Sequence, residues 1–532
     1  MQFPRLSLLR GLILLVSLST LAVSQDVLTY HNNNARTGLN SAETTLTLSN
    51  VNYNAFGKLF TLTVDGLVDA EPLYLSQVTI AGVVHNVLIV ATEHDSVYAF
   101  DADTGAQLWK ITTLLAGETT SDDRGCSQVT PEIGITSTPV INRPKGSNGV
   151  IYVVAMSKDS SGNYYQRLHA LNATSGAELY KGPVTITAQY PGTGDNSSGG
   201  YVVFDPAQYK ERSGLLLEGG ELYLTWASHC DIRPYTGWIM GYNPTTLAQK
   251  TVINVTPNGN EGAIWGAGAG LTGDSAGNIF FLDANGVFDT TLNSSGFPTS
   301  GDYGNAFIRL TTGGGLAVAD YFEMDNGVEE SDSDTDLGSG GAMLLPNMKD
   351  ASGKLWQLAA GAGKDSNLYI VNRASMGKYS SSSNSIYQEL AGALPGGMWA
   401  MPAFFNNRLY YGPVNQPILA FQFKNAVLGT KAIAKTTHAF EYPGATPSIS
   451  ANGNQNGIVW VTENTNPAVM HAYNAANLVE LYNTNQAPNG RDQFGAGNKF
   501  ITPLIINGKV YVGTTTGVGV FGLLSRHDGE SK

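Results

Sequence analysis

The stretch VLIVATEHDSVYAFDADTGAQLWK, residues 87–110, decides the fold of this chain. Residues 87–91 and 97–100 are runs of β-branched and aromatic residues, which favour strands, and the polar segment 93–96 between them is typical of a turn. A second turn, DADTG, precedes a further strand at 107–110. The stretch therefore predicts three consecutive strands joined by tight turns.

Three residues in and after the second turn have a clear mechanical purpose. The Asp101 carboxylate can accept hydrogen bonds from the backbone N–H groups that follow it, and Gly105 can adopt a positive φ without strain. Trp109 offers a large apolar face that can pack between neighbouring units. These features suit a unit that is repeated along the chain.

The same order of strands and turns recurs seven more times towards the C-terminus. The further copies occupy residues 137–182, 214–255, 268–322, 341–379, 400–435, 445–484 and 501–524. Their mean spacing is roughly 60 residues, above the roughly 40–50 of common propeller repeats, and long loops at 189–213 and 325–340 account for the excess. The repeats predict an all-β chain that forms an eight-bladed β-propeller of four-stranded antiparallel blades. Seven blades is the alternative, if the weak copy at 268–322 is an insertion.

A lone strand near the N-terminus offers a way to close the ring. The last copy, 501–524, supplies only three strands, whereas FGKLFTLTV at 56–64 has no hairpin partner before it. Pairing the two completes the last blade and removes an exposed sheet edge. We therefore expect residues 56–64 to close the propeller.

The two ends of the chain have compositions of their own. Arg5 and Arg10 precede an apolar run at 12–16, and the small residues Ala22 and Ser24 follow it, which is typical of a secretory signal peptide at 1–24. We assign 25–55 to an N-terminal arm, 56–524 to the propeller and 525–532 to a C-terminal tail. The chain is then secreted or periplasmic, with no transmembrane segment after signal cleavage.

Composition and charge limit the possible partners. The chain has 532 residues with 62 glycines and 14% charged residues, which favours many turns over long solvated helices. The net charge is −13, and no cluster of Lys and Arg stands out. Nucleic acid and an anionic membrane surface are therefore excluded as partners.

The two cysteines predict one disulfide. An oxidising compartment permits a bridge, and Cys126 and Cys230 are the only pair in the chain. Cys126 precedes the first strand of the second copy and Cys230 follows the second strand of the third, so both lie on the same face of adjacent blades. We expect a Cys126–Cys230 bridge.

At Ala99 the sequence resembles a known family. AFDADTGAQLW matches the AxDxxTGxxxW repeat of pyrroloquinoline quinone (PQQ) enzymes and their relatives through Ala99, Asp101, Thr104, Gly105 and Trp109. The match weakens in later copies, for example at Ala170, Asn172, Ser175, Gly176 and Tyr180. The resemblance implies the eight-bladed architecture of quinoprotein alcohol dehydrogenases and of outer-membrane assembly propellers. The sequence departs from those dehydrogenases in its cysteines, which are not adjacent as they are over the quinone.

Candidate site residues gather in the loops that open on one face of a propeller. They are Glu93, His94, Asp95, Glu132, His229, Asp231, Glu261, Trp265, Lys364, Asp365 and Trp399. Carboxylates with imidazoles suit a divalent metal, or acid and base groups for a bound small molecule. His94, Glu132, His229 and Asp231 are the expected metal ligands, since two imidazoles favour a transition metal over calcium. The alternative is a solvated acidic rim.

Three functions remain open at this point. The preferred one is binding of a small molecule or a protein partner on the loop-rich face. The second is a PQQ-dependent dehydrogenase that oxidises an alcohol or a sugar with PQQ and calcium as its cofactors, although the resemblance itself implies the architecture and not the cofactor. The third is a non-catalytic assembly scaffold. His169 and His471 align with Tyr98 on third strands, so we interpret both as packed structural histidines.

Overall fold

A computed structural model describes residues 25–525, so the predicted signal peptide and most of the predicted tail lie outside the described residues. The described chain is almost entirely strands and loops, which confirms the all-β prediction. Its helical segments are α1 (Gly327–Asp332) and the short 3-10 turns η1 (Tyr30–Asn32), η2 (Gly266–Gly268), η3 (Leu337–Ser339), η4 (Thr484–Gln486) and η5 (Pro488–Gly490). Within 25–525, no helix has the length and apolar character needed to cross a membrane.

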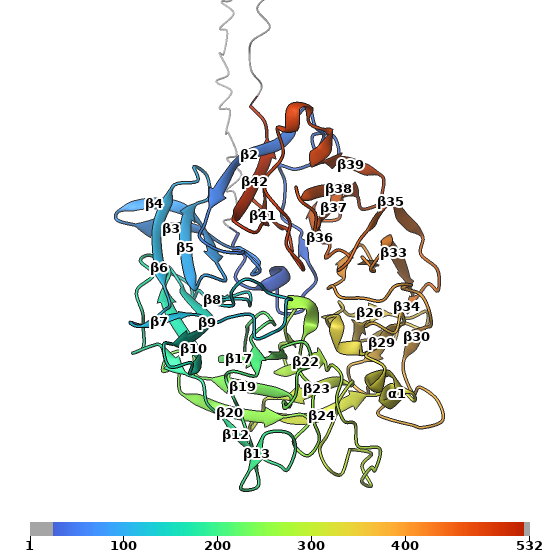
Figure 1. The fold of residues 1–532 in the computed structure, drawn as a ribbon. Helices are drawn as coiled ribbons and strands as arrows, with labels where there is room; N and C mark the ends of the chain where they lie inside the picture. Colours follow the sequence, from blue (N-terminus) through green and yellow to red (C-terminus); the bar gives the residue numbers. More distant parts are fainter. Residues whose placement is uncertain (1–24, 526–532) are drawn as a thin grey trace, which may run out of the picture.

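Eight sheets of four or five strands follow one another along the chain, and we number them sheet 1 to sheet 8 in chain order (Figure 1). Sheet 1 consists of β3 (Leu73–Ile80), β4 (Val83–Ala91), β5 (Ser96–Asp101) and β6 (Gln107–Thr112). Sheet 2 consists of β8 (Val140–Asn142), β9 (Val150–Asp159), β10 (Tyr164–Asn172) and β11 (Val184–Thr185), with β7 (Glu118–Thr120). Sheet 3 consists of β16 (Leu216–Glu218), β17 (Glu221–Thr225), β19 (Trp238–Tyr242) and β20 (Gln249–Asn254), and sheet 4 consists of β21 (Thr272–Gly273), β22 (Asn278–Leu282), β23 (Phe307–Thr311) and β24 (Ala317–Phe322).

Sheet 5 consists of β25 (Met343–Leu344), β28 (Leu358–Gly361), β29 (Leu368–Asn372) and β30 (Gln388–Leu390), and sheet 6 consists of β31 (Ala403–Phe405), β32 (Arg408–Tyr411), β33 (Gln416–Lys424) and β35 (Ala434–Phe440), with β34 (Val427–Leu428). Sheet 7 consists of β36 (Ser448–Asn452), β37 (Gln455–Glu463), β38 (Val469–Asn474) and β39 (Glu480–Asn483), with β1 (Leu39–Asn40). Sheet 8 consists of β40 (Leu504–Ile506), β41 (Lys509–Gly513), β42 (Gly517–Leu523) and the N-terminal strand β2 (Phe56–Thr63). Short strands in the loops make three small sheets: β12 (Gln189–Pro191), β13 (Ser197–Ser198) and β14 (Tyr201–Val203); β15 (Tyr209–Lys210) and β18 (Ala227–Ser228); and β26 (Met348–Lys349) and β27 (Leu355–Trp356). The weak copy at 268–322 forms sheet 4, with four strands like its neighbours.

The turn chemistry expected at residues 101–109 is present in sheet 1. Asp101 Oδ1 accepts hydrogen bonds from the backbone N–H groups of Asp103 and Thr104, at 3.0 and 2.8 Å. Gly105 has a φ of 78°, and the Trp109 indole N–H donates to the Ala173 carbonyl in sheet 2. The turn and the tryptophan between units are confirmed.

The predicted pairing of the N-terminal strand with the last unit is also confirmed. β2 pairs antiparallel with β42, so the N-terminal strand is the fourth strand of sheet 8. Phe56 is fully buried, and its ring lies 5.1 to 6.4 Å from those of Trp460, Tyr482 and Phe521. The start of this strand thus packs against sheet 7 as well as sheet 8.

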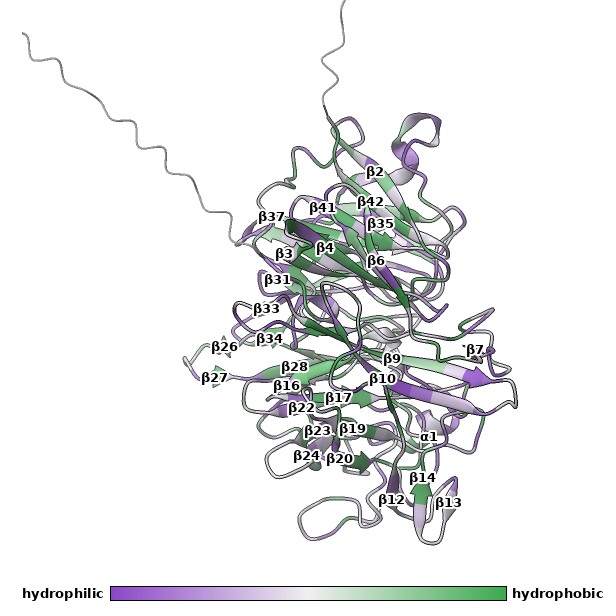
Figure 2. Ribbon diagram, turned by 90° about the vertical axis from the view of Figure 1, so that its left-hand side faces the viewer, coloured by the Kyte–Doolittle hydropathy of each residue, from purple (hydrophilic) through white to green (hydrophobic). Residues whose placement is uncertain are grey.

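Hydrophobic clusters join each sheet to the next, and Figure 2 shows apolar residues concentrated in the stacked strands. One cluster contains residues of sheets 8, 1 and 2 together, and the others join sheets 2 and 3, 3 and 4, 4 and 5, 5 and 6, 6 and 7, and 7 and 8. The packing therefore returns from the last sheet to the first.

The N-terminal arm lies among the first strands of all eight sheets (Figure 1). Backbone or side-chain hydrogen bonds join it to them in chain order: Val27 to Tyr74, Leu28 to Ile141, Asn34 to Leu217 and Gly273, Ala35 to Leu344, Thr37 to Phe404, Gly38 to Ile449, and Asn40 to Ile505. The arm is thus an integral part of the fold, bonded to every sheet.

Candidate functional site

The loops on one face of the sheets enclose a pocket of about 470 Å³, counting the part open to solvent. Its lining residues are Gln128, Arg212, Asp231, Trp265, Ala284, Asn285, Asp336, Ser339, Lys364, Trp399, Tyr442 and Phe500. These residues lie in loops that join the second and third strands of a sheet, or that lead into the next sheet. The loop classes chosen from the sequence are therefore the ones that line the pocket.

Aromatic rings form much of the pocket wall. Trp399 and Tyr442 meet edge to face, with ring centroids 6.0 Å apart. Trp265 is backed by Lys210, whose Nζ lies 5.0 Å from the ring centroid. Flat rings of this kind can stack on a planar ligand with little loss of side-chain freedom.

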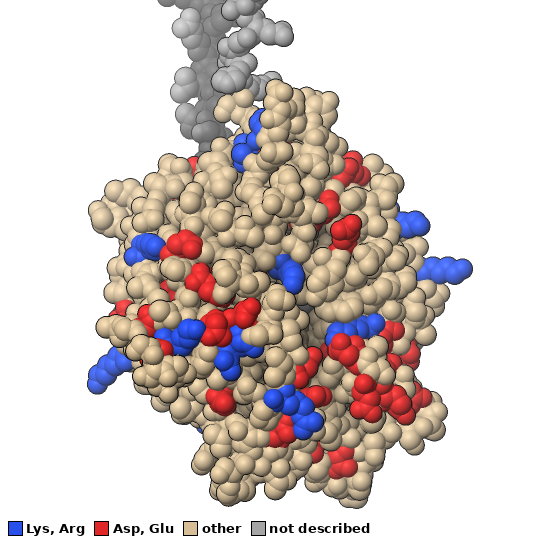
Figure 3. Space-filling model, in the orientation of Figure 1, with Lys and Arg blue, Asp and Glu red and all other residues tan. Residues whose placement is uncertain are grey.

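Two cationic side chains line the pocket in spite of the acidic composition of the chain. Arg212 lies with its guanidinium carbon 4.7 Å from the Phe500 ring centroid, and its closest acidic partner is Asp69, at 3.8 Å. Lys364 Nζ lies 2.7 Å from Asp336 Oδ1 and also contacts Asp334. Figure 3 shows basic side chains near the middle of the face that carries α1, with acidic side chains beside them and further out. The pocket thus has two cationic side chains, Arg212 and Lys364, beside two carboxylates, Asp231 and Asp336.

Burial changes the pKa values of two ionisable side chains at the pocket wall. Lys210 is 1% exposed, and burial, together with the charge of Arg212, lowers its pKa to about 7. Burial raises the pKa of Asp336 to about 6, against the opposing effect of Lys364. Asn285 donates to Asp334 through Nδ2, while its buried Oδ1 has no hydrogen-bond partner. Asn285 Oδ1 is therefore an acceptor available to a ligand.

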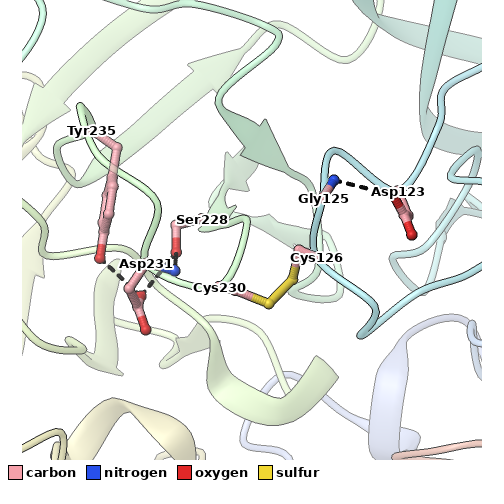
Figure 4. Close-up of a disulfide and its surroundings, with 7 residues drawn as sticks. All are labelled: Asp123, Gly125, Cys126, Ser228, Cys230, Asp231 and Tyr235. Atoms are coloured by element: carbon pink, nitrogen blue, oxygen red, sulfur yellow. Dashed lines mark hydrogen bonds between the residues drawn. A yellow bond between two sulfur atoms is a disulfide. The ribbon is translucent and has the colours of Figure 1, made fainter.

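The predicted disulfide is present at the edge of this site. Cys126 and Cys230 are bonded with their Cα atoms 5.6 Å apart, joining the loop between β7 and β8 of sheet 2 to a loop of sheet 3 (Figure 4). The next residue, Asp231, accepts hydrogen bonds from the Ser228 and Tyr235 hydroxyl groups. The bridge and these two bonds hold the Asp231 carboxylate at the pocket.

The structure places four of the predicted site residues in the pocket: Asp231, Trp265, Lys364 and Trp399. Sequence reasoning missed Arg212, Asn285, Asp336, Tyr442 and Phe500, among others. These residues lie in loops whose sequences do not repeat along the chain. The one sequence signal that could have identified them is their position in loops between or after strands.

The remaining predicted residues lie outside the pocket lining. Glu93 and Asp95 are fully buried, and burial raises the pKa of each well above its usual range. Asp365 accepts a hydrogen bond from the Tyr369 hydroxyl at 2.6 Å. Burial and the nearby Asp231 raise the pKa of Glu261. Glu93 and Asp95 do not lie on a solvated rim, the alternative considered above, because their turn lies beneath the next loop, where Gly134 donates its N–H to Glu93.

The four expected metal ligands have different surroundings in the structure. His94 Nδ1 contacts both carboxylate oxygens of Glu132, at 2.9 and 3.0 Å. His229 is 3% exposed with no hydrogen-bond partner on either ring nitrogen, and Asp231 is engaged as described above. Metal binding by these four residues stays a prediction.

Comparison with known proteins identifies the fold. The chain superposes on a quinohemoprotein alcohol dehydrogenase from Comamonas testosteroni with a TM-score of 0.61 and 15% identity, covering 95% of this chain and 82% of that one. A quinohemoprotein alcohol dehydrogenase from Pseudomonas putida HK5 gives 0.60 and 12%, with coverages of 94% and 80%. A europium-containing methanol dehydrogenase gives 0.61 and 12%, with coverages of 92% and 90%. No protein-family model and no curated protein sequence matches the chain. This chain has the fold of the PQQ-repeat, quinoprotein alcohol dehydrogenase-like β-propellers.

Proposed function

We propose that this chain is a secreted or periplasmic β-propeller that binds a small, flat, anionic organic molecule in its central pocket. The observation that carries the proposal is the pairing of Arg212 and Lys364 with the rings of Trp265 and Trp399 around one space. Cations bind carboxylates, and aromatic faces bind planar rings. The disulfide supports the compartment, because such bridges persist in oxidising environments.

We also propose that the eight sheets are the eight blades of one closed ring. The cluster that joins sheets 8, 1 and 2 supports this arrangement, as does the arm that bonds to all eight first strands. The β2–β42 pairing supplies the closure. In such a ring the pocket lies on the axis, where the loops of several blades meet.

A PQQ-dependent dehydrogenase for an alcohol or a sugar is the second candidate, favoured by the fold. Four residues in the pocket lining suit the organic part of PQQ, an aromatic tricarboxylate: Arg212 and Lys364 would hold its carboxylates, and Trp265 and Trp399 would face its rings. The unpaired Asn285 Oδ1, with Asp231, would face a calcium ion. PQQ, when bound, accepts two electrons from the substrate. The chain's own part in this reading is to orient the ligand and to shield it from water.

Two further interpretations make different predictions about the pocket. A protein partner would bind across the loop-rich face, and an assembly scaffold would leave the pocket without a ligand. Both expect the native protein to bind no small molecule in the pocket. The His94, Glu132, His229 and Asp231 metal site is a separate proposal, tested by comparing the metal content of the native protein with that of the His94→Ala, His229→Ala double variant.

A binding titration with a matched lysine pair tests the main proposal. PQQ with calcium, and benzene-1,3,5-tricarboxylate as a simpler aromatic anion, are titrated while tryptophan fluorescence and heat are followed. We expect Lys364→Met to weaken binding about tenfold or more, which corresponds to about 1.4 kcal/mol for one charge-assisted contact. Lys354→Met is the control, because it removes the same charge from a lysine that lies beside a tryptophan, with its Nζ 3.7 Å from the Trp356 ring centroid, but outside the pocket.

The outcomes separate the candidates. Binding that Lys364→Met weakens and Lys354→Met leaves unchanged supports the pocket. Dye-coupled oxidation of an alcohol or a sugar supports the dehydrogenase interpretation as well, but only if the oxidation requires PQQ. If neither anion binds the native protein, the pocket proposal is wrong and the partner or scaffold interpretations remain.

A further inference from the structure

Two histidines and a glutamate converge at the junction of sheets 6 and 7. His438 lies on β35, the outer strand of sheet 6, while Glu463 ends β37 and His471 lies on β38, both in sheet 7. One nitrogen or oxygen atom from each lies within 4.8 Å of the others, and no other group of three such residues in 25–525 comes as close. None of the three lines the central pocket. The cluster is therefore a separate feature of the molecule.

The distances within the cluster are close to those of a metal site. Glu463 Oε1 lies 2.6 Å from His471 Nε2 and 3.2 Å from His438 Nε2. An ion with tetrahedral bonds of about 2.0–2.1 Å separates neighbouring ligand atoms by about 3.3 Å. Shifts of less than about 1 Å would thus place all three atoms around one ion.

The surroundings orient both imidazole rings. His471 Nδ1 lies 2.7 Å from Glu480 Oε1 and 3.1 Å from the Tyr473 hydroxyl. A carboxylate on one ring nitrogen directs the lone pair of the other towards a metal, as in many zinc sites. The His438 ring stacks on that of His471 with centroids 4.9 Å apart, and its buried Nε2 has Glu463 Oε1, at 3.2 Å, as its neighbour. Both Nε2 atoms therefore face the Glu463 carboxylate.

Sheet 2 shows that the cluster is more than a repeated structural pair. His169 and Glu178 occupy there the positions of His471 and Glu480, and they also contact each other. By strand register, however, Ala155 stands where Glu463 stands: Ala155 pairs with Arg167, and Glu463 with Val469, each two residues before the histidine. The His169 Nε2 accordingly has no hydrogen-bond partner. The packing of the histidine does not require Glu463 or His438, so these two residues need another explanation.

The cluster lies next to the molecular surface on the side of His438. The His438 side chain is 40% exposed, whereas Glu463 and His471 are 14% and 4% exposed. An ion could thus enter beside His438 and keep a water molecule as its fourth ligand. We propose that His438, Glu463 and His471 bind a divalent transition-metal ion of the zinc type, which links sheets 6 and 7 and keeps one coordination position open. Two imidazoles and one carboxylate suit zinc, whereas calcium prefers oxygen ligands alone.

The test uses the full secreted chain without a histidine tag, stripped of metal with a chelator. Zn²⁺ is titrated by calorimetry, and Co²⁺ is added separately to read ligand geometry from its visible absorption. We expect one ion bound per chain, a tetrahedral Co²⁺ spectrum and a rise in the unfolding temperature with zinc. His438→Ala should weaken zinc binding at least tenfold and abolish the Co²⁺ spectrum. Glu480→Gln should weaken zinc binding about tenfold to a hundredfold, because it only orients His471.

His85→Ala is the matched control, since His85 contacts a single carboxylate, Asp101, at 2.6 Å. It should bind zinc like the native protein. The proposal is overturned if the native protein binds no zinc, or if His438→Ala binds it as tightly as the native protein does. Because His438 is partly exposed, the metal-free variant should unfold at the native temperature. The pocket titration with Lys364→Met is independent of this result.

Discussion

At the scale of single residues, His229 shows how burial, helped by neighbouring positive charges, can make stability depend on pH. Burial, followed by the charges of Lys210 and Arg124, lowers its pKa from 6.5 to about 3. The folded state thus holds the proton less tightly than the unfolded state does, so the stabilising contribution is complete above pH 6.5 and is lost as the pH falls towards 3.

We therefore predict that acid destabilises the native protein more than His229→Gln. Because buried carboxyl groups titrate in both proteins, the quantity to compare is the difference between their free energies of unfolding. This difference should shift against the native protein by about 1.4 kcal/mol per pH unit below pH 6.5. Urea unfolding of both proteins over this range checks it, and parallel stability curves would contradict it.

Arg36 is a second residue whose position sets a large energetic cost. Its side chain is fully buried and donates to the carbonyl oxygens of Tyr30, Leu215 and Leu271. Arg36→Met should leave these oxygens without donors and lower the free energy of unfolding by about 3–5 kcal/mol. Chemical denaturation measures the loss, and Lys58→Met, at a half-buried position on β2, provides the comparison. A loss below about 1 kcal/mol would show that water or neighbouring groups satisfy the carbonyl oxygens.

At the scale of strands, the closing strand β2 carries a testable contrast. Phe56 is fully buried against rings of sheets 7 and 8, whereas Leu59 on the same strand is 37% exposed. Phe56→Ala should destabilise the protein by about 3–5 kcal/mol. Leu59→Ala should cost less than about 1 kcal/mol, because few of its contacts are buried. Equal losses in urea unfolding would mean that β2 does not depend on the Phe56 contact for its place.

The strands also show what could be predicted from the sequence. Asp101, Gly105 and Trp109 act through contacts that are local or one repeat away, so their turn and the strands beside it were predictable. The pairing of β2 with β42 was predictable because one strand was missing at one end and one was unpaired at the other. Arg212, Tyr442 and Phe500 come together only through the packing of distant loops, and no local pattern marks them. The burial of Glu93 and Asp95 was missed for the same reason.

At the scale of the whole molecule, the N-terminal arm joins parts that are far apart in the chain. Its bonds to the first strands of all eight sheets make it a shared neighbour of every sheet. In a repeat fold each unit normally contacts only its neighbours, so the units can unfold in steps. The arm and the β2 closure couple the first sheet to the last, and we expect this coupling to make unfolding cooperative.

This coupling can be tested by cutting the chain between the arm and β2. The arm and β2 are joined through residues 41–55, in which Tyr53 is 43% exposed. Cleavage at a protease site placed at Tyr53–Asn54 would break the covalent link between the arm and β2, while the hydrogen bonds of the arm to the sheets remain. If the arm is held by its own hydrogen bonds, the cleaved protein should keep the arm on gel filtration and unfold in one transition at a lower temperature. Loss of the arm with an unchanged unfolding temperature would show that the sheets pack around the axis without it.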